Sequence, residues 1–364
     1  MTVLHVGGAA PYDVVVGRGV LDRIPNMLGA DPQRIALVHA ETLSEIADAV
    51  AATLADYEVL RIPLPEGEPA KTANVAISAW EALGEYGFTR SDAVVSVGGG
   101  ATTDMAGFIA ATWLRGVRVV HVPTTLLAMV DAAVGGKTGM NTGAGKNLVG
   151  SFHEPAGVVC DLDLLTTLPA AELVAGLGEV IKCGFIADPV ILSLVEADPQ
   201  AAVDPTSAVL TELVERSIAV KIDVVVADLK ETGGADGHPG REVLNYGHTL
   251  AHAIEKLTDY TIRHGEAVAI GCCYAAELAR SAGLLDDATA QRHSRAFGAV
   301  GLPVRVPPLP GGFADVREVM AVDKKSRGAT LRFLVLESLA HPVILASPSE
   351  ELLASAYAEI GGRP

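Results

Sequence analysis

The order of strand-like and helix-like segments limits the fold of this chain more than any other feature. In the first half, short runs rich in β-branched residues alternate with helix-length segments. The runs are 12–17, 34–40, 57–64, 92–100, 116–125 and 156–163, and the helical segments include 42–55, 72–87 and 101–113. Strands that alternate with helices predict a mostly parallel, wound α/β sheet.

The pattern changes near residue 165. After Pro169, long segments rich in Ala, Leu, Val and Glu show helical periodicity, with one short strand expected at 331–337; the helical segments are 170–186, 206–228, 243–257 and 265–282. A chain of 364 residues also exceeds the usual size of a single core. We therefore predict an α/β domain over 1–165 and a mainly α-helical domain over 166–364.

The overall charge excludes some partners. The chain has 27 Lys and Arg against 44 Asp and Glu, a net charge of −17, which argues against nucleic acid or an anionic membrane as a partner. We find no signal peptide and no membrane span in the sequence. The four cysteines lack a paired metal-binding spacing and two of them are adjacent, so a reducing cytoplasm is expected. An anionic substrate would need a local basic pocket.

A glycine motif follows one of the buried strand-like runs. The run ends in Gly98, Gly99 and Gly100, and the helix that follows carries Asp104. Glycines let backbone amides approach a pyrophosphate, whose charge the amino end of a helix favours. A tight turn explains the glycines equally well, because glycine serves any turn that needs a positive φ. Both interpretations stay open.

Lysines stand among glycines and small polar residues in the stretch 122–150. Its polar side chains include Thr124, Thr125, Asp131, Lys137, Lys146 and Asn147. A lysine ammonium offers several donors to a compact anion, so this composition indicates a phosphate or carboxylate site. The alternative is a surface loop with solvated lysines.

Three of the ten histidines lie close together in the second half. His248 and His252 are four residues apart and would share a helix face, and His264 follows a break. Glu179 and Lys182 lie three apart in the apolar segment "GLGEVIKCGFI". Glu179 with two histidines would form a set that binds zinc and leaves a position open. Spacing alone does not choose the ligands, and the candidates are His248, His252, His264, Glu255 and Glu266. Surface salt pairs and buried histidines without metal are the alternatives.

Several long motifs resemble the 3-dehydroquinate synthase family of the sugar phosphate cyclase superfamily. They are "EGEPAKT", "GGGATTDMAGFIAATWLRG", "VPTTLLAMVDAAVGGKTGMNTGAGKNLVG", "GLGEVIK", "REVLNYGHTLAHAIE", "RHGEAVAIG" and "MAVDKKSRGATLRFLVL". The resemblance runs in order from about Tyr12 to the carboxyl terminus. It implies a Rossmann-like NAD-binding α/β domain followed by a helical domain that binds metal and substrate.

The resemblance also implies an activity. Family members convert 3-deoxy-D-arabino-heptulosonate 7-phosphate to 3-dehydroquinate and phosphate, a step toward chorismate and the aromatic amino acids. They are NAD- and metal-dependent lyases that use transient oxidation, β-elimination of phosphate, reduction and intramolecular aldol cyclisation. NAD is regenerated in each turnover. A cytoplasmic homodimer that binds a small sugar phosphate is expected.

Motif by motif, the resemblance assigns residues to roles. It implies that Glu179, His248 and His264 bind Zn²⁺, with Co²⁺ or another divalent ion as an alternative. The catalytic residues it implies are Lys137, Lys182, Glu231, Arg241, Asn245, His252 and Lys325. Those for substrate and its phosphate are Arg115, Asp131, Lys146 and Asn147. Those for NAD are Glu68, Lys71, Gly99, Gly100, Asp104, Thr124, Thr125, Thr167 and Leu168.

The sequence departs from the family pattern at three places. Glu41 stands where relatives contact the adenine ribose, Gly178 precedes Glu179 and is expected to loosen its helix, and 233–240 is an insertion. Alternative functions are an aminodehydroquinate synthase, a cyclase of sedoheptulose 7-phosphate, and a metal-dependent glycerol or alcohol dehydrogenase. A non-catalytic binding protein is a further alternative. The dehydrogenase has little use for Arg115, Lys137, Lys146 and Lys325, because its substrate carries no phosphate.

Overall fold

A computed structural model describes residues 1–231, 233, 239–324 and 331–363 of the chain. They form two compact units, Met1–Leu168 and Pro169–Pro364. Among the described residues, no helix combines the length and the apolar character needed to cross a bilayer.

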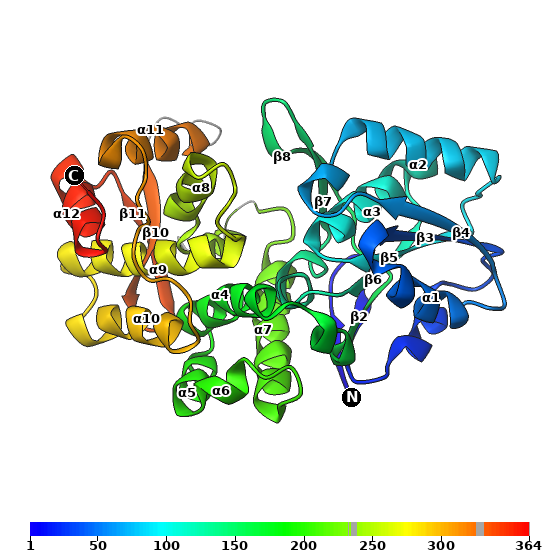
Figure 1. The fold of residues 1–364 in the computed structure, drawn as a ribbon, viewed down its shortest axis with the longest axis horizontal. Coiled ribbons are helices and arrows are strands. Elements are labelled where there is room, and N and C mark those ends of the chain that lie inside the picture. Colours follow the sequence, from blue (N-terminus) through cyan, green and yellow to red (C-terminus); the bar gives the residue numbers. More distant parts are fainter. Residues whose placement is uncertain (232, 234–238, 325–330, 364) are drawn as a thin grey trace. The chain divides into compact units, whose positions relative to one another are not determined.

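The first unit is built on a wound sheet (Figure 1). Within the described residues the sheet has seven strands in the order β1-β2-β9-β6-β5-β3-β4. The strands are β1 (Thr2–Val6), β2 (Tyr12–Gly17), β3 (Arg34–Ala40), β4 (Glu58–Leu64), β5 (Ala93–Gly98), β6 (Arg118–Pro123) and β9 (Gly157–Asp161). β1 pairs antiparallel with β2, and the other pairs are parallel. The predicted, mostly parallel sheet is therefore confirmed.

Alternating side chains of the strands fill a core on each face of this sheet. In β3, Ala36 and Val38 pack with helices α2 (Ala73–Glu85) and α3 (Gly100–Thr112). Ile35 and Leu37 point the other way, toward η1 (Leu21–Met27) and α1 (Ser44–Ala52). Strands buried on both faces are typical of a doubly wound sheet. This arrangement leaves the carboxyl ends of β5 and β6 to form loops at one edge.

The glycine-rich stretch after β6 folds into regular structure. A π-helical turn, η5 (Ala128–Ala132), precedes a hairpin of β7 (Lys137–Thr142) and β8 (Gly145–Phe152). The two strands pair antiparallel from Lys137 opposite Phe152. No strand pattern marks this stretch of the sequence, because glycine and lysine are depleted in most strands.

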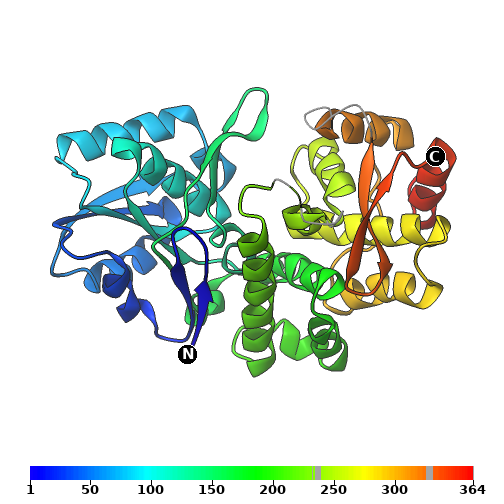
Figure 2. The same ribbon diagram turned by 180° about the vertical axis from the view of Figure 1, so that it is seen from behind.

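The second unit is mainly helical, as predicted (Figure 2). Its central helix, α9 (His264–Ser281), is buried along most of its length and packs against α4 (Ala170–Ile186), α8 (His248–Leu257), α10 (Asp287–Ala299), α12 (Glu350–Glu359) and β10 (Arg332–Ser338). The predicted strand at 331–337 is β10, which pairs with β11 (His341–Ala346). In the described part of this unit, the remaining helices are α5 (Pro189–Ala197), α6 (Pro199–Ala202), α7 (Ala208–Ala227), η8 (Gly240–Asn245) and α11 (Gly312–Lys324).

Gly178 lies at a close contact between two helices. α4 runs without interruption through this position. A Cβ added at Gly178 would collide with the backbone of Gly265, and one at Gly265 would collide with the backbone of Ala175. The two glycines therefore allow α4 and the first turn of α9 to meet, which brings Glu179 beside His264.

Candidate active site

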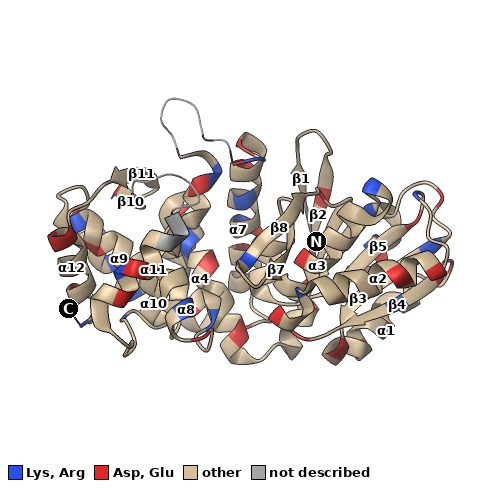
Figure 3. Ribbon diagram, turned by 90° about the horizontal axis from the view of Figure 1, so that it is seen from above, with Lys and Arg blue, Asp and Glu red and all other residues tan. Residues whose placement is uncertain are grey.

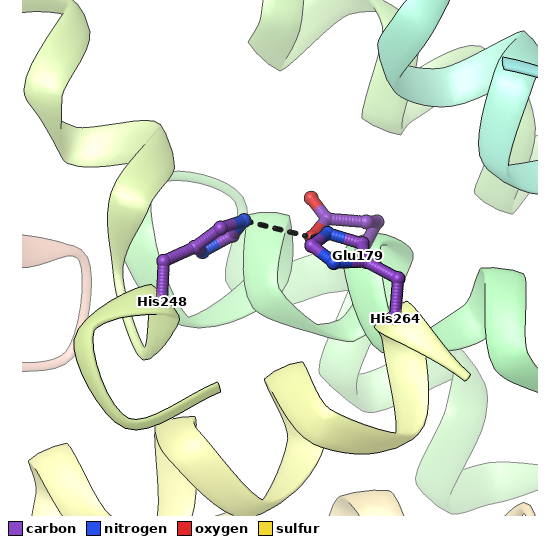
Figure 4. A group of neighbouring side chains, drawn as sticks. All are labelled: Glu179, His248 and His264. Carbon is purple, nitrogen blue, oxygen red and sulfur yellow. Dashed lines mark ion pairs between the residues drawn. The ribbon is translucent and has the colours of Figure 1, made fainter. Parts of the chain in front are cut away.

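Three helices of the second unit bring a carboxylate and two imidazoles together (Figure 4). Glu179 lies within α4, whereas His248 and His264 are the first residues of α8 and α9. One ligand atom from each residue lies within 4.8 Å of the others. Glu179 Oε1 is 3.5 Å from His248 Nε2 and 3.6 Å from His264 Nε2. Of the five candidates that spacing left open with Glu179, the structure thus brings together His248 and His264.

Glu179 Oε1 shows that these residues fit a metal ion. This oxygen is buried and has no hydrogen-bond partner among the described residues, which is costly for a carboxylate unless a cation completes it. Two ligands about 2.0–2.1 Å from a tetrahedral zinc ion lie about 3.4 Å apart, close to the 3.5 and 3.6 Å found here. One carboxylate and two imidazoles are a suitable donor set for zinc or cobalt.

The neighbours of each donor set its orientation. His248 Nδ1 donates to the carbonyl oxygen of Tyr246 at 3.1 Å, which leaves the lone pair of Nε2 directed to Glu179. His264 Nδ1 lies 3.4 Å from Glu255 Oε1. Partners of this kind fix the tautomer and the ring orientation of a metal-binding histidine. Glu255 is thus a carboxylate behind a ligand, not one of the three clustered donors.

Burial and neighbouring charges shift the pKa values of the three clustered side chains in different directions. Burial disfavours the Glu179 carboxylate, but the Lys182 ammonium and the two facing imidazoles outweigh burial and hold its pKa well below the usual range. Burial and then Lys182 lower the pKa of His248 well below its usual value. Burial also opposes charge on His264, but the carboxylates of Glu179 and Glu255 raise its pKa to about 10. The metal-free site therefore carries its proton on His264.

Lys182 supports the second oxygen of Glu179. Its side chain is buried, and Nζ donates to Glu179 Oε2 and, at 2.6 Å, to the carbonyl oxygen of Leu244. The ammonium thereby occupies Oε2 and leaves Oε1 to the two imidazoles. A buried charge of this kind is stable only because it is paired.

The first unit contains the residues predicted to bind NAD. Gly99 is the N-cap of α3 and Gly100 is its first residue, so the free amides of this helix end follow β5 directly. Thr124 donates its backbone N–H to the Gly98 carbonyl at 3.0 Å, which ties the end of β6 to the glycine loop. Thr125 lies next along the chain, and a Cβ added at Gly99 would lie 3.3 Å from Thr125 Cγ2.

A buried lysine lies beside this loop. Lys71 Nζ is 2.5 Å from Asp104 Oδ2 and also donates to the side-chain oxygen of Asn147. Burial raises the pKa of Asp104 to about 6, although Lys71 acts to lower it. Lys71 and Asp104 therefore connect α3 to the β7–β8 hairpin.

Glu68 makes a second connection to the same hairpin. Its Oε2 accepts from Asn141 Nδ2 at 2.5 Å, and its Oε1 lies 3.7 Å from Lys146 Nζ. The segment "EGEPAKT" thus contacts residues on both hairpin strands. Asn141 was missed in the sequence, where its lone amide carried no signal.

Comparison with known proteins decides the family. Residues 61–175 match the family described as 3-dehydroquinate synthase N-terminal, and residues 176–326 match 3-dehydroquinate synthase C-terminal. A curated 3-dehydroquinate synthase of Thermobifida fusca is 57% identical over 100% of this chain and 97% of its own length. The chain belongs to the 3-dehydroquinate synthase family. Another curated 3-dehydroquinate synthase, from Streptomyces avermitilis, is 56% identical over 99% of both chains. The predicted family is confirmed.

Solved structures with the same fold hold a nucleotide and a metal. A 2-deoxy-scyllo-inosose synthase with carbaglucose-6-phosphate, NAD⁺ and Co²⁺ has a TM-score of 0.87 at 25% identity, over 98% of this chain and 100% of that one. The 2-epi-5-epi-valiolone synthase of Streptomyces hygroscopicus, with NAD⁺ and Zn²⁺, has a TM-score of 0.86 at 25% identity, over 99% of both. A glycerol dehydrogenase of Schizosaccharomyces pombe shares only the fold, with a TM-score of 0.68 at 16% identity, over 95% of this chain and 88% of that one. Both cyclases hold NAD⁺ and a divalent metal, and this 3-dehydroquinate synthase family member has a cluster of metal-binding side chains. Together these findings support NAD and a divalent metal as its cofactors.

The other residues to which the family resemblance assigns a role are distributed over both units. In the first unit, Asp131 lies in η5, exposed Lys137 begins β7, and Lys146 and Asn147 lie on β8. Thr167 ends the helical turn η6 (Leu162–Thr167) and Leu168 is its C-cap. In the second unit, exposed His252 lies one turn after His248, with their ring centroids 5.4 Å apart. Lys325 lies outside the described residues.

Arg241 and Asn245 lie on η8, next to the insertion. Asn245 Nδ2 donates to Glu231 Oε1 at 3.3 Å, and buried Arg241 donates from Nη1 to the Leu229 carbonyl at 2.7 Å. Asp228, which the sequence reading missed, accepts the backbone N–H of Arg241 at 3.1 Å and that of Gly233 at 3.0 Å. Asp228 therefore joins chain segments on both sides of residues 234–238. No pattern in the sequence marks it, because its partners are backbone groups.

Arg115 lies on an unusual turn after α3. Leu114 and Arg115 have φ angles of 49° and 68°, which non-glycine residues rarely adopt and which is often found at functional sites. Arg90 donates to the Leu114 carbonyl from Nε at 3.2 Å and from Nη2 at 3.0 Å. Arg90 thus holds the turn that leaves the Arg115 side chain exposed.

Proposed function

We propose that this chain converts 3-deoxy-D-arabino-heptulosonate 7-phosphate to 3-dehydroquinate and phosphate, with NAD and a divalent metal, as a phosphate-eliminating lyase. The observation that carries the proposal is the Glu179, His248 and His264 cluster with its buried Lys182. It occurs in a chain 57% identical to a curated 3-dehydroquinate synthase. The less similar cyclases, at 25% identity, support the fold and the cofactors more than the substrate.

The metal ligands would act on hydroxyl groups of the substrate. Glu179, His248 and His264 would hold the ion through Oε1 and two Nε2 atoms. When bound, NAD supplies a hydride acceptor that is regenerated and the divalent ion supplies positive charge beside a reacting hydroxyl. Lys182 pairs with the second oxygen of Glu179, leaves Oε1 to the ion, and is assigned to contact with the substrate beside the metal.

Residues around the ligands would bind and orient the rest of the substrate. Asn245 is held by Glu231, and exposed His252 lies on the same helix as the ligand His248. We assign these side chains, with Arg241 and Lys325, to substrate contact and proton movement. We assign Lys137, Lys146, Asn147, Asp131 and Arg115 to the carboxylate and phosphate. Figure 3 shows acidic and basic positions mixed along both units, so these assignments rest on local lysine and arginine residues rather than on a basic face.

We assign the NAD site to the first unit. Gly99, Gly100, Thr124 and Thr125 would surround the pyrophosphate, because they lie at the amino end of α3 and after β6. Lys71 and Asp104 form the buried pair beside them, and Glu68, Thr167 and Leu168 complete the assignment.

We further propose a homodimer in the cytoplasm. The strained turn at Leu114 and Arg115 presents an arginine outward, and the β8 strand exposes Leu148, Val149 and Phe152. Exposed apolar side chains on one strand favour contact with a second copy. The described cysteines are all free and buried, which agrees with a reducing compartment.

Phosphate release tests the proposed function. Purified protein receives the heptulosonate phosphate, NAD⁺ at a small fraction of the substrate, and Zn²⁺, with a chelated control. The amino analogue of the substrate is assayed alongside. We expect 3-dehydroquinate in excess of the NAD⁺ supplied, and no turnover after chelation. Turnover of the amino analogue alone would refute the assigned substrate, and net NADH formation without phosphate release would indicate a dehydrogenase.

A further inference from the structure

Two buried polar side chains outside the donor cluster contact each other behind His248. Tyr246 and His293 are both fully buried, and Tyr246 Oη lies 2.9 Å from His293 Nε2. Tyr246 follows η8 and His293 lies on α10. Neither residue belongs to the metal, NAD or substrate positions.

The hydrogen-bond pattern fixes the direction of this contact. His293 Nδ1 lies 2.9 Å from the Thr289 carbonyl oxygen, which only accepts, so Nδ1 carries the proton. His293 Nε2 is then an acceptor, and the Tyr246 hydroxyl donates to it. Phe185 stacks on the imidazole with ring centroids 3.6 Å apart and planes 13° apart. Burial lowers the pKa of His293 to about 3, so the ring stays neutral in this arrangement.

The backbone of Tyr246 continues to the metal ligand. Its carbonyl oxygen accepts from His248 Nδ1 at 3.1 Å, and Cys272 Sγ lies 3.6 Å from the same oxygen. Gly247 lies between Tyr246 and His248 and has a φ of 80°. A Cβ at Gly247 would lie 2.6 Å from the Cys272 backbone nitrogen. The turn is therefore confined against α9. A displacement of Tyr246 would rotate the carbonyl that orients His248.

We propose that Tyr246 and His293 are positioning residues that hold His248 in its metal-binding orientation through the Tyr246 carbonyl. The chain of contacts runs from His293 to the Tyr246 hydroxyl, and from the Tyr246 carbonyl to His248 Nδ1. The inference rests on the proposed metal site. The Tyr246 hydroxyl contacts none of the metal-binding atoms of Glu179, His248 and His264. The inference predicts that this hydroxyl nevertheless affects the affinity for the metal.

A matched tyrosine in the same unit separates positioning from stability. Tyr274 is equally buried, and its hydroxyl donates to the Leu353 carbonyl at 3.3 Å. Tyr246→Phe and Tyr274→Phe each remove one buried hydroxyl from the full-length chain. Zn²⁺ affinity is measured by competition with a chelator, and the visible spectrum is recorded for the Co²⁺-loaded proteins. Urea unfolding of the metal-free proteins gives the change in stability.

We expect Tyr246→Phe to weaken Zn²⁺ binding about tenfold, the lower end of the range for groups behind a metal ligand, and to alter the Co²⁺ spectrum. Tyr274→Phe should change stability by a similar amount and leave both metal readouts unchanged. Equal metal affinity in the two variants would overturn the inference and leave Tyr246 a structural residue.

His293→Leu and the double variant test the coupling of the pair. Because both single changes break the same hydrogen bond, the double variant should also lose about tenfold rather than about hundredfold. An additive loss would show that the two residues act independently and would overturn the proposed pair. His293→Gln, which keeps an acceptor for the tyrosine, should retain the Zn²⁺ affinity of the parent, and a tenfold loss in this variant would contradict the proposed pair even if His293→Leu does not fold.

His248→Ala distinguishes failure of this inference from failure of the metal site. If His248→Ala keeps the Zn²⁺ affinity of the parent, the ligand assignment itself is wrong. If His248→Ala loses the metal and Tyr246→Phe keeps it fully, the ligand assignment stands and the positioning role is refuted.

Discussion

Metal binding to the second unit should release one proton, and that proton comes from His264. The carboxylates of Glu179 and Glu255 outweigh burial and raise the pKa of His264 to about 10, whereas a metal ion requires the neutral imidazole. The pKa values of Glu179 and His248 are lowered, so these two ligands have no proton to lose near neutral pH. The metal therefore competes with a single proton.

The size of the effect follows from the distance between pH and pKa. At pH 7, removing a proton from a group with a pKa of about 10 costs about 4 kcal/mol, since each pH unit corresponds to about 1.4 kcal/mol. The side chain of His264 is 28% exposed, and water contact makes this an upper figure. The apparent Zn²⁺ affinity should rise about tenfold per pH unit from pH 6 to 8.5. If His264 had the ordinary pKa of a histidine, the apparent Zn²⁺ affinity would instead level off above about pH 6.5.

Glu255→Gln tests the cause of this dependence. The carboxylate of Glu255 lies 3.4 Å from His264 Nδ1, so its removal should lower the pKa of His264 and make the affinity level off at a lower pH. Glu266→Gln is the matched control, because Glu266 lies on the same helix but bonds the Arg263 backbone in a capping box. Chelator competition gives the affinity, and titration calorimetry in two buffers counts the released protons.

Two results would refute the reasoning. One is an affinity in the parent that is flat above pH 7, which would show that His264 is already neutral. The other is a pH curve for Glu255→Gln that matches the parent curve, which would show that Glu255 does not hold the proton.

Other predictions concern both units. Lys182→Ala should keep Zn²⁺ and NAD but lose turnover; metal analysis and a rate assay check this, and loss of the metal would show that Lys182 is needed for the ligands themselves. His264→Ala should empty the metal site, so an unchanged zinc content contradicts its assignment. Lys71→Met should lower the free energy of unfolding in urea by roughly 3 kcal/mol at pH 8 and by less at pH 5, because Asp104, whose pKa is already raised to about 6, is then protonated; equal losses at both values would contradict this. Burial lowers the pKa of His121 to about 3, below its unfolded value of about 6.5. Its contribution to stability should be complete above pH 6.5 and fall between pH 6.5 and 3, and His121→Leu should show a smaller loss of stability between pH 7.5 and 5 in urea than the parent does.

Sequence patterns predicted the elements that are marked by a continuous apolar run or by a clear helical period. β3 and β5 are buried on both faces, and their β-branched runs stood out for that reason. Segment 170–186 agrees with α4 at both ends. The β7–β8 hairpin was missed, because its glycines and lysines resemble a loop and its pairing depends on the partner strand.

The site was predictable in its residue types but not in its geometry. Spacing identified a histidine cluster, and the resemblance narrowed it to Glu179, His248 and His264. Only the structure shows that Glu255 contacts the Nδ1 atom of His264 and that Glu266 caps α9. The role of Gly178 also could not be read locally, because a backbone on another helix determines it.

The three clustered donors all belong to the unit Pro169–Pro364, and they come from α4 and from the consecutive helices α8 and α9. A bound ion would therefore be a reversible cross-link between α4, α8 and α9. At a free metal concentration one hundred times the dissociation constant, it would add about 2.7 kcal/mol to the stability of the structure that holds it. Amide hydrogens of these helices should then exchange more slowly in the presence of zinc, while those of the Met1–Leu168 sheet keep the same exchange rates. Metal supply would in this way set the lifetime of one half of the protein.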